Sequence, residues 1–173
     1  AVISMNGIVS AETARTAGLQ LDEAIINYVR KKYGIVIGQP TAESLKLRIG
    51  AAIPQNEQKS MEIQGQDQVT GLPKPASLTT DEIVEAMQPP LQNIVGMIKR
   101  VLEKTPPELI SDIIDRGVAI CGGTALLRGM DKYLTLALGI PAYLVDNPLT
   151  CTAEGAARGL AMIDTLFRNL PAV

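Results

Sequence analysis

The sequence predicts an α/β fold, in which strands and helices alternate and pack as layers. Hydrophobic residues make up 46% of the 173 residues, enough for a substantial buried core. Short apolar runs rich in β-branched residues are separated by segments with the 3.6-residue period of amphipathic helices. In segment 117–129 an apolar run leads into Gly122-Gly123-Thr124, and a helical pattern follows at once. That order is typical of a strand, a tight turn and a helix N-terminus.

Helices and strands are expected along the whole chain. In the first half we expect a hairpin over 1–10 with its turn at Asn6-Gly7, a helix over 21–33 ended by Gly34, a helix that begins after Pro40 with Thr41 as N-cap and runs to about Ala52, and strands over 61–70 and 75–79. In the second half we expect a helix from Thr80 that Pro89-Pro90 ends or kinks and that resumes at Leu91, a helix over 107–116, a strand before Cys121, a helix over 125–138, a strand over 142–145 and a helix from about Thr150 to Leu166.

The composition excludes several functions. The chain has no histidine, which removes His-based catalysis and the usual zinc ligand sets. Only 3% of the residues are aromatic and the net charge is -2, so nucleic acid is not an expected partner. Cys121 and Cys151 have no metal-ligand spacing and are interpreted as buried, reduced thiols. No apolar run has the length of a membrane span.

Two local motifs each allow a structural and a functional interpretation. Gly122-Gly123-Thr124 could be a plain turn with Thr124 as helix N-cap, or a turn whose free N–H groups and helix dipole face a ligand. Glu43 and Lys46 share one helix face and could form a solvated surface pair. Alternatively they could form a polar clamp, with Glu43 accepting from ribose hydroxyls or an amine and Lys46 donating to a nucleoside. On local sequence alone the structural interpretation is favoured at both places.

Five segments in this order resemble the MreB family of bacterial actins. They are Thr41–Gly50, Leu72–Lys74, Leu102–Glu108, Cys121–Gly129 and Asn147–Gly155. The opening residues and Asp22–Arg30 are similar to the same family, so the resemblance covers essentially the whole chain.

The resemblance implies the second domain of an actin-like ATPase, a ribonuclease-H-like domain with a mixed sheet flanked by helices. Residues 1–17 and 84–173 would form the ribonuclease-H-like subdomain, and residues 18–83 an inserted α+β subdomain. The chain would then be the second half of a longer protein, and its last helix would normally pack on the first domain.

The resemblance also implies the nucleotide-binding positions. Those expected on the base and ribose side are Gly18, Glu43, Ser44, Leu45, Lys46, Gly122, Gly123, Thr124 and Ala125. Intact members of the family bind ATP or ADP with Mg²⁺. For this segment alone, the absence of any bound nucleotide is one possible outcome. No catalytic or metal-binding residue is assigned to it, and it is expected to be inactive as an ATPase. Gly18-Leu19-Gln20 lacks two acidic residues common at this place in the family, which leaves any contact they supply in doubt.

The implied function is a filament-forming cytoskeletal protein that controls rod cell shape. Its partners would be further copies of itself, joined head to tail, and a membrane-anchored adaptor such as RodZ, without nucleic acid or direct membrane insertion by this segment. The intact protein would be cytoplasmic and membrane-associated as filaments. The alternatives are a stand-alone module that binds filaments or an adaptor without nucleotide chemistry and, more weakly, half of a kinase of the same superfamily.

Overall fold

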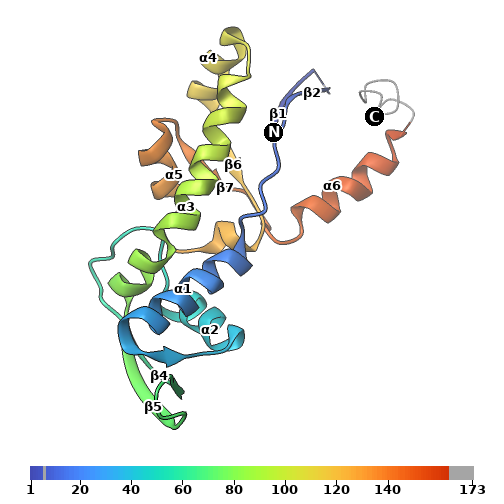
Figure 1. Cartoon of the computed structure of the whole chain (residues 1–173). Coiled ribbons are helices and arrows are strands. Elements are labelled where there is room, and N and C mark those ends of the chain that lie inside the picture. The colour runs from blue at the N-terminus through green and yellow to red at the C-terminus, as the bar shows by residue number, and fades with distance from the viewer. Residues whose placement is uncertain (6, 164–173) are drawn as a thin grey trace.

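The computed structural model describes residues 1–5 and 7–163, and helices and strands alternate along them (Figure 1). The first half contains β1 (Val2–Ser4), β2 (Gly7–Ser10), α1 (Gly18–Tyr33), β3 (Ile35–Val36), α2 (Gln39–Ile49), β4 (Ser60–Asp67) and β5 (Pro73–Thr79). The second half contains α3 (Thr80–Glu103), α4 (Pro107–Arg116), β6 (Val118–Ile120), the short 3₁₀ helix η1 (Gly123–Leu126), α5 (Met130–Leu138), β7 (Ala142–Leu144) and α6 (Cys151–Leu160).

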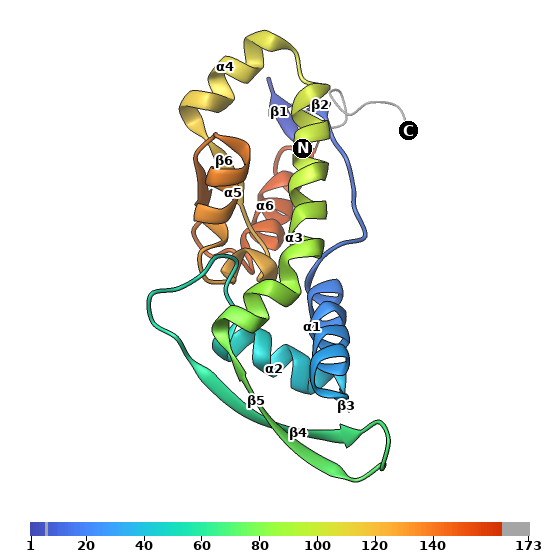
Figure 2. The ribbon, with the colours of Figure 1, turned by 60° about the vertical axis from the view of Figure 1, so that its left-hand side comes forward.

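The strands form three separate sheets. Antiparallel β1 and β2 make a hairpin, β3, β4 and β5 make an antiparallel sheet in that order, and β6 and β7 pair in parallel. Figure 2 shows the long β4–β5 hairpin at one end of the molecule and the β1–β2 hairpin at the other. A hollow of about 900 Å³ lies between β1, β6, α3 and α4, and residues of all four elements line it.

An aliphatic core connects α1, α2, the β3–β4–β5 sheet, α3 and α5. Leu21 and Ile25 of α1, Leu45 of α2, Leu78 of β5 and Met87 of α3 are all at most 1% exposed. Met130 and Leu134 of α5 belong to the same cluster. In agreement with the low aromatic content of the sequence, the core consists of leucine, isoleucine, valine, alanine and methionine side chains.

Most expected elements are confirmed, with corrections at their ends. Helix α1 begins at Gly18, three residues before the expected start, and Gly34 ends it in the left-handed conformation. The assignment of Thr41 as N-cap is wrong. Gly38 occupies that position and Thr41 lies inside α2, because Pro40 fits the first turn of a helix, where its missing N–H is not needed.

The two prolines in α3 do not end it. One helix runs from Thr80 to Glu103 with Pro89 and Pro90 inside. Each proline removes a backbone hydrogen bond, but Met87 and Leu91 on either side are fully buried. Burial of the apolar face therefore outweighs the two lost bonds.

The C-terminal region is more exposed than expected. Cys121 is exposed and Cys151 half-buried, so the interpretation of both as buried thiols is wrong; Cys121 lines the 900 Å³ hollow. Helix α6 has no buried side chain in the described structure, and a Cβ added at Gly155 would meet no atom within 4 Å. The last part of the expected helix, residues 164–166, lies outside the described residues.

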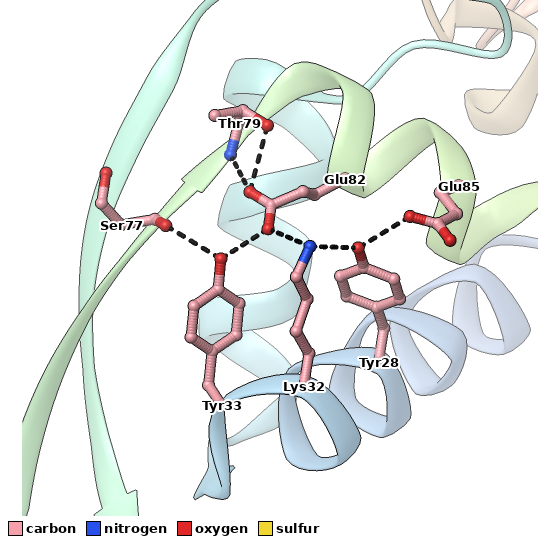
Figure 3. A network of polar contacts seen from close by, with 7 residues as sticks. All are labelled: Tyr28, Lys32, Tyr33, Ser77, Thr79, Glu82 and Glu85. Carbon is pink, nitrogen blue, oxygen red and sulfur yellow. Dashed lines mark hydrogen bonds and ion pairs between the residues drawn. The ribbon is translucent and has the colours of Figure 1, made fainter.

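A polar network joins α1 to the start of α3 (Figure 3). Glu82 accepts hydrogen bonds from the backbone N–H of Thr79 at 2.8 Å and from its hydroxyl at 3.0 Å, closing a capping box. The other oxygen of Glu82 accepts from the Tyr33 hydroxyl and pairs with Lys32 Nζ at 2.9 Å. Burial raises the pKa of Glu82, but the hydrogen bonds from Tyr33, Lys32 and Thr79 outweigh burial and hold that pKa at about 2, below the ordinary 4.5.

We expect Glu82→Gln to lower the free energy of unfolding at pH 7 by about 1.5–3 kcal/mol, the range for hydrogen bonds to a charged group. The lowered pKa makes the Glu82 contribution complete above pH 4.5, and it is lost as the pH falls toward 2. The difference between parent and variant should therefore shrink over that interval in urea unfolding followed by circular dichroism.

Glu85→Gln is the matched control, because Glu85 lies on the same helix, is exposed, and accepts one hydrogen bond from Tyr28 that a glutamine can also accept. It should leave the stability within about 0.5 kcal/mol of the parent. A pH-independent difference between parent and Glu82→Gln would contradict the role given to the ionised carboxylate.

Candidate functional site

A pocket of about 440 Å³ lies where the start of α1, the middle of α2 and the turn after β6 meet. Segments more than 70 residues apart in the sequence supply its walls. The lining residues are Gly18, Leu21, Glu43, Lys46, Leu47, Gly50, Gly123, Thr124, Leu126, Leu127, Arg128 and Leu149. The volume is in the range of pockets that hold small organic ligands.

The pocket brings together five of the nine residues expected at the site: Gly18, Glu43, Lys46, Gly123 and Thr124. The three segments approach closely, since a Cβ added at Gly18 would lie 3.4 Å from Lys46 Nζ and 3.8 Å from Thr124 Oγ1.

The other four expected residues do not line the pocket. Leu45 is fully buried in the core and Ser44 beside it is half-buried. Gly122 lies just before the lining segment, and Ala125 faces the 900 Å³ hollow instead.

Lys46 is paired with a residue that the sequence analysis did not select. Its Nζ lies 2.7 Å from Asp22 Oδ1 and donates to the backbone carbonyl of Gly18 at 3.2 Å. The solvated pair of Glu43 with Lys46 is thus not formed, although Glu43 lies on the same pocket wall.

The glycine turn differs from the expected helix N-terminus. Residues Gly123–Leu126 form a 3₁₀ helix, and the α-helix expected from Ala125 begins only at Met130. The N–H of Gly122 is not free, since it donates to the Pro148 carbonyl at 2.7 Å. The α-helix dipole therefore does not act at Gly122-Gly123-Thr124, since this turn leads into a 3₁₀ helix and α5 has its N-cap at the left-handed Gly129.

Arg128 fastens the turn to the end of α2. Its Nε donates to the Gly50 carbonyl at 3.0 Å, and its own carbonyl accepts from Ala52 N–H at 2.8 Å. Nη2 of Arg128 is buried and has no hydrogen-bond partner among the described residues. Arg128 was not selected from the sequence, because its side chain bonds to a residue 78 positions away in the chain. The available signal for its role was its position inside the motif Cys121–Gly129.

The pocket has an apolar wall with a few polar groups, the arrangement typical of small-molecule sites. Leucines form much of the wall, while Glu43 supplies acceptors and Thr124, Lys46 and Arg128 supply donors. Within the described residues no group of three or more Asp, Glu or Cys side chains is placed to hold a metal ion. None of the helices in that part of the chain is long and apolar enough to span a membrane.

The fold and this pocket define a domain of the actin-like class. MreB5 of Spiroplasma citri bound to AMPPNP superposes with a TM-score of 0.87 over 94% of this chain and 49% of that protein, at 36% identity. The MamK double helical filament superposes with a TM-score of 0.65 over 82% of this chain and 43% of MamK. At 20% identity, MamK supports the shared fold alone.

The chain belongs to the MreB/Mbl protein family, whose model matches residues 1–168. The cell shape-determining protein MreB of Escherichia coli (strain K12) is 47% identical over 164 residues, which are 95% of this chain and 47% of that protein. The cell shape-determining protein Mbl of Bacillus subtilis (strain 168) is 41% identical over 96% of this chain and 50% of Mbl. The chain thus spans about half the length of these relatives. The family resemblance stated from the sequence is confirmed.

The turn at Gly129 gives a direct test of how the pocket wall is held. Gly129 has a φ of +73°, and a Cβ there would lie 2.8 Å from Ile53 Cγ1. We expect Gly129→Ala to lower the free energy of unfolding by about 2–4 kcal/mol, since backbone strain and a steric clash add together. Gly139→Ala is the control, because Gly139 has a φ of +70° but no atom within 4 Å of the added Cβ. Gly139→Ala should lower the free energy of unfolding, measured by thermal unfolding, by about 1–2 kcal/mol. Equal losses of stability in the two variants would show that the contact of residue 129 with Ile53 is unimportant.

Proposed function

We propose that the 440 Å³ pocket binds the base and ribose of an adenine nucleotide, and that the protein is part of a filament-forming, cell shape-determining cytoskeletal protein. The observation that carries the proposal is the convergence of Gly18, Glu43, Lys46, Gly123 and Thr124 on one pocket. Helix α2 and the turn after β6 are more than 70 residues apart in the sequence. Both supply residues that the family resemblance assigns to the nucleotide site, and these residues line one pocket.

The chemistry of the pocket suits a nucleoside. A purine is a flat, largely apolar ring system with polar edges, and leucine walls with a few polar groups suit such a ligand. Glu43 has carboxylate oxygens for ribose hydroxyls or an exocyclic amine, and Lys46 and Thr124 have donors for ring or ribose acceptors. MreB5 of Spiroplasma citri has been solved bound to AMPPNP and to ADP.

The pocket is less suited to the phosphates. Of the two cations that line it, Lys46 is charge-paired with Asp22, and Arg128 is turned by its Nε toward the Gly50 carbonyl; Glu43 adds a negative charge to the same wall. In the intact protein we expect phosphate and Mg²⁺ contacts to come from residues beyond this segment. In the intact protein we also expect hydrolysis of ATP, coupled to polymerisation.

The proposed partners follow from the family. We expect head-to-tail association with further copies of the protein, since such a heterologous contact propagates into a filament instead of closing. A membrane-anchored cell-shape adaptor such as RodZ is a second expected partner, and membrane association would occur through the assembled filaments.

The 173-residue chain should bind ADP and ATP with equal, weak affinity, because the proposed contacts touch only base and ribose. Titrations followed by the amide NMR signals of Gly18, Lys46 and Gly123 would measure both affinities.

Glu43→Ala should weaken binding about tenfold or more, the effect of losing a hydrogen bond to a charged group. Glu23→Ala, a change at an exposed acid on α1, should leave the affinity unchanged. A Mg²⁺-dependent preference for ATP, or no shift with either nucleotide, would refute the proposal.

The same chain should remain monomeric or form short oligomers in dilute solution. Filament contacts that act in tandem raise each other's effective concentration, so a segment that carries only part of them loses much more than a proportional share of the assembly. Sedimentation over a concentration series would measure this. A compact two-fold dimer at low concentration would contradict the head-to-tail interpretation.

A further inference from the structure

Asp22 is a buried acid for which neither the fold nor the proposed ligand contacts provide a role. It lies in the second turn of α1 and is 2% exposed. It does not line the 440 Å³ pocket but lies behind the wall that Lys46 forms. Burying a carboxylate costs free energy unless another charge compensates it.

Lys46 supplies that compensation. Its Nζ is 2.7 Å from Asp22 Oδ1, and the side chains of Lys46 and Asp22 are 13% and 3% exposed. Apart from this ion pair, Asp22 Oδ1 receives no hydrogen bond from the described residues. This charge pair joins α1 to α2 beside the apolar contacts that the two helices make in the core.

Lys46 keeps N–H donors that are available to a ligand. An ammonium group has three N–H donors. The Gly18 carbonyl, 3.2 Å from Nζ, accepts from one of them, whereas the 2.7 Å contact with Asp22 Oδ1 is an ion pair without hydrogen-bond geometry. Both partners belong to α1, so they hold the Nζ against that helix while the side chain lines the pocket.

We propose that Asp22 is a positioning residue. It fixes the Lys46 ammonium group so that an oriented N–H points into the pocket, while the Asp22 carboxylate compensates the positive charge of that group. Such a donor suits an uncharged acceptor, a ring nitrogen or a ribose oxygen, and gives little advantage to a phosphate. Asp22 would therefore contribute to the selection of the nucleoside part of the ligand. The inference rests on the proposed function, because it assigns a residue to the same pocket.

The test uses adenosine, which carries no phosphate, and NMR titration of the 173-residue chain. Asp22→Asn keeps the side-chain volume and removes the charge that holds Lys46. We expect it to weaken adenosine binding about tenfold, the loss of one hydrogen bond to a charged group. Glu23→Gln is the matched control, since Glu23 is the next residue of α1 and is exposed; its affinity should equal that of the parent.

A double-mutant cycle separates positioning from a merely structural role. Lys46→Gln retains a donor toward Asp22 and removes the ammonium group. In that background Asp22→Asn should cause no further loss of adenosine affinity, because Asp22 acts through Lys46. Equal losses in both backgrounds, or no loss in the parent background, would overturn the inference. If Asp22→Asn fails to fold by circular dichroism, Asp22→Glu, which displaces the carboxylate by one methylene, is carried through the same cycle with the same expectation.

Failure of this inference differs from failure of the proposed function. If the parent chain and Glu23→Gln bind no adenosine, the nucleoside site itself is refuted, and the role of Asp22 with it. If they bind adenosine and Asp22→Asn binds it equally well, the pocket stands and the positioning role of Asp22 is wrong.

Discussion

Burial of the apolar face of α3 is the constraint on which the rest of the structure depends. Met87 and Leu91 are fully buried, and the cluster around them reaches α1, α2 and β5 on one side and α5 on the other. This burial keeps the helix continuous through Pro89 and Pro90 at the cost of two backbone hydrogen bonds. The segments before and after α3 are thereby packed against one element (Figure 2).

The candidate site is a consequence of that packing. Neither α2 nor the turn after β6 forms a pocket by itself; they face each other because both belong to elements packed on α3. The bond from Arg128 to the Gly50 carbonyl, 3.0 Å long, then fixes their separation, and the ion pair of Lys46 with Asp22 fixes α1 against α2. A ligand in the pocket would touch all three segments, which couples its binding to the way the segments are arranged.

Local sequence patterns predicted the elements well and the site only in part. Helix α4 and the β4–β5 hairpin follow from periodicity and turn residues, which act over a few positions. The split between η1 and α5 could not be predicted in this way, because it depends on Gly129 lying against Ile53 and on Arg128 reaching α2. Asp22 was missed for the same reason: its importance lies in a partner 24 residues away, and its own neighbourhood looks like any amphipathic helix.

The uneven distribution of buried side chains means that the chain does not have one uniform stability. The β1–β2 hairpin and α6 contribute almost nothing to the main core; the hairpin region is fastened to α3 chiefly through polar contacts such as Ser10 to the Val101 carbonyl at 3.2 Å. Elements of this kind open by local unfolding at a lower free energy than the core. The backbone amides of β1 and α6 would then exchange with solvent while α1, α2 and α3 remain closed. Apart from Leu149, which lies two residues before α6, the pocket walls lie on the slowly exchanging side of that boundary, so most of the pocket keeps its geometry when the exposed elements fluctuate.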